Sequence, residues 1–232
     1  MLDKQTFLLG IFRHLMLKTS SLHSNGLWNG KMGICLFFYR YADFSQNPLH
    51  SEFAGEILDE IIDSIDVNIL YDFDNGIYGI AWGIDYLIRH GYVEADPDDF
   101  FANLDEKLYQ RKFSAFSNSI EISYLKGVAY YLISRLGNRY SSRHSLLYDN
   151  VDLLCRKIQK VNPKDDELIF LLKQLMQIYN RQDVKYLEEP LHSVVKKICY
   201  DMNWSISSSC PLGISNNGLA GIGLKILEDL NI

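Results

Sequence analysis

The hexapeptide Asn-Gly-x-x-Gly-Ile occurs three times, as NGKMGI at 29–34, NGIYGI at 75–80 and NGLAGI at 217–222. The intervals between the starting positions are 75 − 29 = 46 and 217 − 75 = 142 residues, so the second is about three times the first. Two weaker copies are therefore expected in the gap, and the chain reads SYLKGV at 123–128 and ELIFLL at 167–172. A nearly constant period of this length is typical of repeat proteins built from helical hairpins.

An amphipathic helix is expected before each copy of the motif, and a more apolar helix after it. The earlier helices carry apolar residues at i, i+3 and i+4, with charged residues on the opposite face. They are expected at about 3–18, 55–66, 97–112, 142–160 and 184–201. The sequence therefore predicts an all-α fold of ten helices in five pairs, with the charged helices outside and the apolar helices inside.

The motif itself has a structural interpretation. We expect its asparagine to cap the inner helix, by accepting a hydrogen bond from a free backbone N–H group. The two glycines, three positions apart, leave a smooth stripe on which another backbone can approach closely. Since glycine costs up to about 1 kcal/mol inside a helix, its repeated use at one place indicates a packing requirement.

The composition indicates one globular domain with no nucleic-acid partner. Hydrophobic residues make up 47% of the 232 residues, and no Pro-rich or Gly/Ser-rich linker divides the chain, so a single domain over 1–232 is expected. The net charge of −6 argues against the basic face that nucleic-acid binding requires. No segment approaches the roughly 20 apolar residues of a membrane span. The four cysteines lack paired spacing, so a reducing, cytoplasmic location is expected.

Three glycine-rich segments, at 26–42, 75–96 and 212–227, resemble those of a known family. With these segments the chain resembles the lanthionine synthetase C-like (LanC-like) family, whose Gly-rich turns open the inner helices of an α/α toroid. The resemblance implies an α/α barrel of about five helical hairpins here, where the family has seven. It also implies a zinc ion that activates a cysteine thiolate of a precursor peptide. The thiolate then adds to dehydroalanine or dehydrobutyrine and closes a thioether ring.

The motifs through which the family holds zinc, of the types Trp-Cys-x-Gly and Cys-His-Gly, do not occur in this sequence. No metal ligand is therefore assigned. The first hypothesis is a divergent, non-catalytic member that binds a peptide in a lanthipeptide-type maturation system. Two alternatives stay open: a zinc-dependent, thioether-forming peptide cyclase with rearranged ligands, and a small α/α-barrel hydrolase that acts on carbohydrate. A ring that does not close would expose edge helices and favour a homodimer.

The N-termini of the inner helices are expected to gather at one end of the barrel. Their free N–H groups and positive dipole ends make that end the natural mouth of a cavity. His23 and Cys210 are the candidates for catalysis, because the first and last repeats become neighbours in a closed ring. A thiol near helix N-termini has a lowered pKa and can ligate a metal or attack an electrophile. The alternative is that both residues are incidental.

Six further side chains are expected at the mouth as binding groups: Trp28, Lys31, Asp72, Asp74, Trp82 and Asp85. Asp72 and Asp74 can bind a cation or serve as acid and base, or they can be turn formers before the second inner helix. For Asp85 the alternative is an ion pair with Arg89, four residues further along the same helix.

Overall fold

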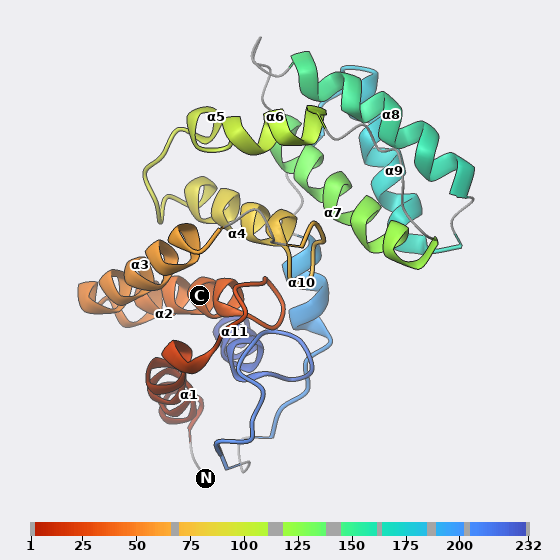
Figure 1. Cartoon of the computed structure of the whole chain (residues 1–232). Helices are drawn as coiled ribbons and strands as arrows, with labels where there is room; N and C mark the ends of the chain where they lie inside the picture. The colour runs from red at the N-terminus through yellow and green to blue at the C-terminus, as the bar shows by residue number, and fades with distance from the viewer. Residues whose placement is uncertain are drawn as a thin grey trace. The chain divides into compact units, whose positions relative to one another are not determined.

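The computed structural model describes residues 3–65, 70–110, 118–137, 145–161, 164–184, 189–201 and 205–230. Within these ranges the regular elements are helices and there is no β-strand, which confirms the all-α prediction. None of the helices described is both long and apolar enough to cross a lipid bilayer. Contacts divide the chain into two compact units (Figure 1). Unit 1 comprises Met1–Leu70, Asp74–Gly83 and Glu188–Ile232, and unit 2 comprises Tyr71–Phe73 and Ile84–Leu187.

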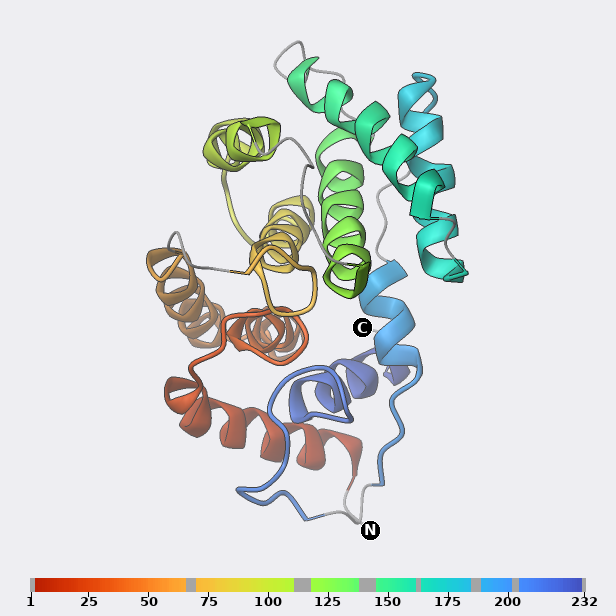
Figure 2. The same ribbon diagram turned by 45° about the vertical axis from the view of Figure 1, so that its right-hand side comes forward.

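Unit 1 is built around the two helices that carry the first and last copies of the motif. These are α2 (Lys31–Ser45) and α11 (Leu219–Asp229), which pack against each other. α2 also packs on α3 (Pro48–Asp63), and α11 packs on α1 (Lys4–Lys18) and α10 (Glu189–Lys196). Figure 2 shows α11, in dark blue, beside α1, in red. The first and last repeats are therefore neighbours.

The helices α2 and α11, which clear copies of the motif open, are more deeply buried than α1, as the sequence predicts, whereas α9, which carries the weak copy at 167–172, buries only one face. In α2 the buried positions run without a break from Met32 to Tyr39, so this helix is covered on all sides there. α1, in contrast, buries one face, through Phe7, Leu8, Ile11, Phe12 and Leu15. A helix with one apolar face lies at the surface, whereas a helix that is apolar all round lies in the core.

Two of the predicted outer helices of unit 1 have different bounds. The helix expected at 55–66 begins earlier, because Asn47 accepts a hydrogen bond from the backbone N–H of Leu49 at 3.1 Å and Pro48 takes the first helical position. A proline is favourable there since its missing N–H group has no partner to lose. The helix expected at 184–201 is shorter, and α10 ends at Lys196. Residues 185–188 lie outside the described part of the chain.

Among the described residues of unit 2, the last turns of α4 (Ile77–Arg89) are followed by α5 (Pro97–Phe100), α6 (Ala102–Gln110), α7 (Asn118–Leu136), α8 (Ser145–Val161) and α9 (Asp166–Tyr179). α9 packs on α7 and α8, and α8 also packs on α6. The single helix expected at 97–112 is interrupted at Phe101, whose side chain is only 2% exposed and whose φ and ψ are −91° and 1°. Residues 111 and 112 lie outside the described residues.

Asp165, at the N-cap of α9, provides a pH-dependent contact within unit 2. Its carboxylate lies 2.7 Å from Nζ of Lys126 on α7 and accepts a hydrogen bond from the backbone N–H of Leu168 at 2.9 Å. Burial acts in the opposite direction, but the hydrogen bonds from Lys126 and Leu168 prevail and lower the pKa of Asp165 below its usual value. A carboxyl group with a lowered folded-state pKa stabilises the fold above its ordinary pKa, and that contribution is lost as the pH falls through the folded value.

We therefore expect Asp165→Asn to lower the free energy of unfolding by about 0.5 kcal/mol at pH 7, because the pair is partly exposed. The difference from the unsubstituted protein should shrink below about pH 4, where the wild-type carboxyl group begins to take up its proton. Urea unfolding followed by circular dichroism over a series of pH values measures this difference. A gap that stays constant down to the lowest pH would show that the charge of Asp165 is not its source.

Candidate functional site

The three clear copies of the motif come together within unit 1. The backbone N–H of Trp28, just before the first copy, donates to the carbonyl of Asp74 at 3.0 Å, just before the second copy. The N–H groups of Ile214 and Ser215, which precede the third copy, donate to the carbonyl of Trp28 at 2.7 and 3.1 Å. The segment at 26–29 therefore joins the segments that precede the second and third copies.

Side chains of the motif extend this junction. Asn29 Nδ2 donates to Asn75 Oδ1 at 3.5 Å, and the hydroxyl of Ser215 donates to Asn29 Oδ1. The side chains of Asn29 and Asn75 are both exposed, whereas Trp28 is buried, with 9% of its surface exposed. We call Trp28, Asn29, Asp74, Asn75 and Ser215 together the asparagine rim.

The predicted capping role of the asparagine is wrong for the first and third copies. The N-cap residues of α2 and α11 are Gly30 and Gly218, and neither helix has a side-chain capping bond. The glycines occupy the cap because a Cβ atom on Gly30 would collide with the backbone of Gly26, and one on Gly218 with the backbone of Gly213. The asparagine is thereby moved one residue outward, where its amide bridges neighbouring segments instead.

The predicted close approach at the second glycine is confirmed for the same two copies. A Cβ atom on Gly33 would lie under 3.0 Å from the carbonyl oxygen of Leu27, and one on Gly221 under 3.0 Å from that of Ile214. Real Cβ atoms essentially never come this close to other heavy atoms. The motif therefore lets the segments before α2 and α11 run directly across the helices that they precede.

The structure places the other predicted binding residues in different surroundings. Lys31 Nζ lies 2.7 Å from a carboxylate oxygen of Glu60 on α3. Asp74 is exposed, and its backbone carbonyl belongs to the asparagine rim. Asp72 is partly buried and belongs to unit 2, so the two aspartates of YDFDNG fall in different units. Trp82 is buried in unit 1, with 1% of its surface exposed.

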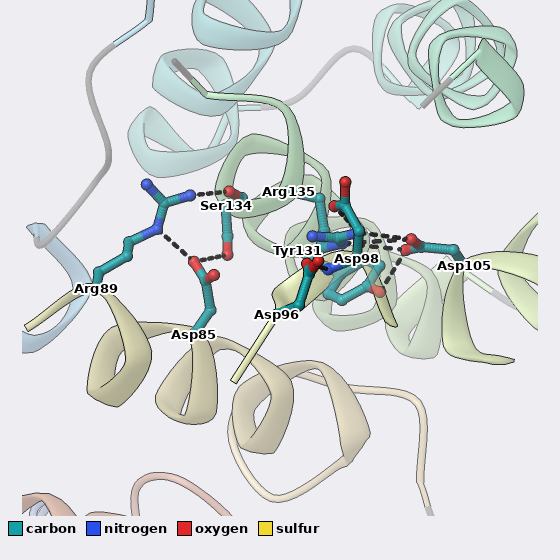
Figure 3. Close-up of polar contacts among 8 residues, drawn as sticks. All are labelled: Asp85, Arg89, Asp96, Asp98, Asp105, Tyr131, Ser134 and Arg135. Atoms are coloured by element: carbon teal, nitrogen blue, oxygen red, sulfur yellow. Dashed lines mark hydrogen bonds and ion pairs between the residues drawn. The ribbon is translucent and has the colours of Figure 1, made fainter. Parts of the chain in front are cut away.

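Asp85 lies in unit 2, within a buried polar cluster (Figure 3). Its Oδ2 accepts from Nε of Arg89 at 2.6 Å and from the hydroxyl of Ser134 at 2.6 Å. Arg89 also donates to the carbonyl of Ser134 at 2.5 Å. The alternative of an Asp85–Arg89 ion pair is therefore confirmed, and this pair ties α4 to α7.

A second cluster, which sequence reasoning did not find, surrounds Arg135 on α7 (Figure 3). Nη2 of Arg135 lies 3.0 Å from Asp98 Oδ1 and 2.9 Å from Asp105 Oδ2. The hydroxyl of Tyr131 donates to Asp105 Oδ1 at 2.5 Å, and the guanidinium lies 5.3 Å from the centre of the Phe101 ring. The partners are distant in sequence and follow no motif, so no sequence signal indicated the pairing. The cluster fixes α5 and α6 against α7.

His23 and Cys210 both lie in unit 1, but no hydrogen bond or ion pair joins them in the described structure. His23 is exposed. Cys210 is buried, and its sulfur accepts a hydrogen bond from the backbone N–H of Ser207 at 3.3 Å. Cys35 is buried as well, and its thiol lies 3.5 Å from the carbonyl oxygen of Ala54 on α3. Cys199 is exposed beyond the end of α10.

The donor groups needed for a zinc centre are not assembled in the part of the chain that the structure describes. No group of three or more His, Cys, Asp or Glu side chains there could hold a metal ion. A structural or catalytic zinc ion takes at least three protein ligands. The described residues therefore do not fit the zinc site that the family resemblance implies.

Comparisons with models of protein families, with curated protein sequences and with solved structures find no match to this chain.

Proposed function

We propose that this chain is a divergent LanC-like protein that binds a peptide in a lanthipeptide-type maturation system and does not itself close the thioether ring. In this proposal its helical pairs form the α/α toroid of that family and the protein acts in the cytoplasm. The observation that supports it best is the junction of the three Asn-Gly segments at the asparagine rim. The resemblance to the family depends on these same segments, and they meet at one place in unit 1 although they are far apart in sequence.

The chemistry of the asparagine rim suits a peptide. A carboxamide presents a hydrogen-bond acceptor and two donors close together, which is the pattern that a peptide group requires. Asn29 and Asn75 are exposed, and their side chains are held by the bond between them and by Ser215. Side chains that are already ordered lose less conformational entropy when a ligand binds, so such a pair favours binding.

Binding of a precursor-type peptide tests the proposal. The probes are a synthetic peptide with cysteine, serine and threonine residues, and its dehydrated form with dehydroalanine and dehydrobutyrine. We expect isothermal titration calorimetry to give a Kd in the micromolar range for at least one of them. Asn29→Ala should weaken binding about tenfold, equivalent to about 1.4 kcal/mol, because it removes the central amide of the asparagine rim.

The matched control is Asn180→Ala, which removes an exposed asparagine at the C-terminal end of α9 in unit 2 and should leave the Kd unchanged. Circular dichroism confirms that both variants are folded. The proposal fails if neither peptide binds up to about 1 mM, which would leave less than about 4 kcal/mol of binding free energy. It also fails if the two variants weaken binding equally.

A further inference from the structure

His50, in the first turn of α3, is a half-buried titratable side chain that none of the features above uses. Its ring centre lies 4.4 Å from that of Phe12 on α1 and 5.2 Å from that of Tyr41 on α2. Phe12 and Tyr41 stack on each other at 4.3 Å, and both are buried. His50 therefore lies where the start of α3 meets α1 and α2, and all three helices belong to unit 1.

Both ring nitrogens of His50 have a partner. Nδ1 lies 2.7 Å from the hydroxyl of Ser45 at the end of α2, and Nε2 lies 3.3 Å from Nδ2 of Asn47. Asn47 is also the N-cap of α3, since its Oδ1 accepts from the backbone N–H of Leu49 at 3.1 Å. The hydroxyl of Ser45 donates in turn to the carbonyl of Ala42 at 3.3 Å. These bonds join the end of α2 to the start of α3, and we call Ser45, Asn47 and His50 together the histidine bridge.

The helix cap determines which nitrogen of the ring carries the proton. Because Oδ1 of Asn47 is used by Leu49, the amide turns its NH2 group toward His50, and Nε2 accepts that hydrogen bond. A neutral imidazole has one donor and one acceptor nitrogen, so the proton is on Nδ1, which donates to Ser45. A charged ring donates from both nitrogens. Its Nε2–H would face the NH2 group of Asn47, and an amide turned round to accept from it would no longer cap α3.

The surroundings of the ring also disfavour its charged form. Burial lowers the pKa of His50 below its ordinary value, and no charged neighbour adds to this effect. The positive end of the α3 dipole acts in the same direction, whereas the negative end of α2 and the faces of the two aromatic rings favour a cation. The ionisable side chains at these contacts, or within two residues of them along the three helices, are Arg13, His14, Arg40, Tyr41, Asp43 and Glu52.

We propose that the histidine bridge is a pH-sensitive contact, which holds the start of α3 on α1 and α2 while His50 is neutral and releases it when His50 takes up a proton. The remainder of α3 stays in place, because its buried face begins at Ala54 and continues to Ile61. The unfolded chain binds the proton more readily than the folded one. The stability of the contact therefore falls as the pH drops below about 6.5, the ordinary pKa of histidine.

Hydrogen exchange of the full chain, read by NMR, tests the proposal. After correction for the intrinsic pH dependence of exchange, the protection of amides 49–54 should fall about threefold or more between pH 7 and about pH 5, while that of amides 57–61 stays constant. The nitrogen shifts of the His50 ring at pH 7 should be those of the tautomer protonated at Nδ1. His50→Gln keeps a donor and an acceptor but does not titrate, so the pH dependence at amides 49–54 should disappear.

Asn47→Asp is the matched variant, for which the expected effect has the opposite sign. One carboxylate oxygen still caps α3, while the other accepts from Nε2–H and so stabilises the charged ring. The protection of amides 49–54 should then rise as the pH drops from 7 to about 5, because a raised pKa adds stability on the acid side. A fall in Asn47→Asp equal to that of the unsubstituted protein overturns the proposal. So does a neutral His50 ring protonated at Nε2, and these two measurements decide the matter even where His50→Gln does not fold.

Discussion

Replacing Arg135 with methionine is expected to lower the free energy of unfolding by about 3–5 kcal/mol, the cost of removing one partner from a buried ion pair. The Arg135 side chain is 1% exposed, and it lies 3.0 Å from Asp98 and 2.9 Å from Asp105. Burial alone would lower the pKa of Arg135, but the hydrogen bond and the charge of Asp105 raise it. The guanidinium is therefore a permanent cation. Without it, two half-buried carboxylates face each other with no positive charge between them.

The matched control is Arg156→Met. Arg156 forms an ion pair with Asp152 at 2.9 Å, but its side chain is 69% exposed, so the loss should be below about 0.5 kcal/mol. Urea unfolding, followed by circular dichroism and by tyrosine fluorescence, measures both variants and shows whether the transition is two-state. A second change, Asp105→Asn in the Arg135→Met background, should restore part of the loss, because it removes one of the uncompensated charges. Equal stabilities of Arg135→Met and Arg156→Met would contradict the buried-pair interpretation.

Sequence reasoning located the helices well where a local pattern controls them. The Asn-Gly motif marks the start of α2 and α11 to within a residue or two, because a backbone that crosses the helix at Gly33 and Gly221 can be accommodated only by glycine. The 3.6-residue periodicity of the outer helices likewise indicated α1 and α8 almost to their ends. These signals are local, since they depend on residues that are close in the chain.

Features that depend on distant partners could not be read in the same way. The asparagine was assigned a capping role because Asn is a common N-cap, but the crossing segment reserves the cap for glycine at Gly30 and Gly218. Nothing in the local sequence distinguishes Arg135 from the other basic residues, because its partners Asp98 and Asp105 are brought to it by α5 and α6. The contact between Asn29 and Ser215 was anticipated only as a meeting of repeats, because the periodicity gives neighbouring segments but no side-chain partners.

Gly221→Val is expected to have the second large effect, a loss of about 3 kcal/mol or more in the free energy of unfolding. A Cβ atom at this position would lie 2.5 Å from Cδ1 of Ile198 and closer still to the carbonyl oxygen of Ile214. The Ile198 side chain can turn away, but the carbonyl belongs to a backbone segment that is fixed by the 2.7 Å bond from the N–H of Ile214 to Trp28. To fit valine, α11 must move away from this segment, and the asparagine rim must open.

The same measurement has a control within unit 1. Gly55, on α3, has only the hydroxyl of Tyr39 within reach, at 3.8 Å from a Cβ atom, so Gly55→Ala creates no collision and should raise stability by up to about 1 kcal/mol through helix propensity. The substitutions at these two glycines of unit 1 are therefore expected to change the free energy of unfolding in opposite directions.

Gly221→Val should also lose peptide binding at temperatures where the protein is still folded, because the junction of the three Asn-Gly segments depends on the crossing at this position. A valine variant that is as stable as the parent would mean that the glycines of the motif serve no packing role.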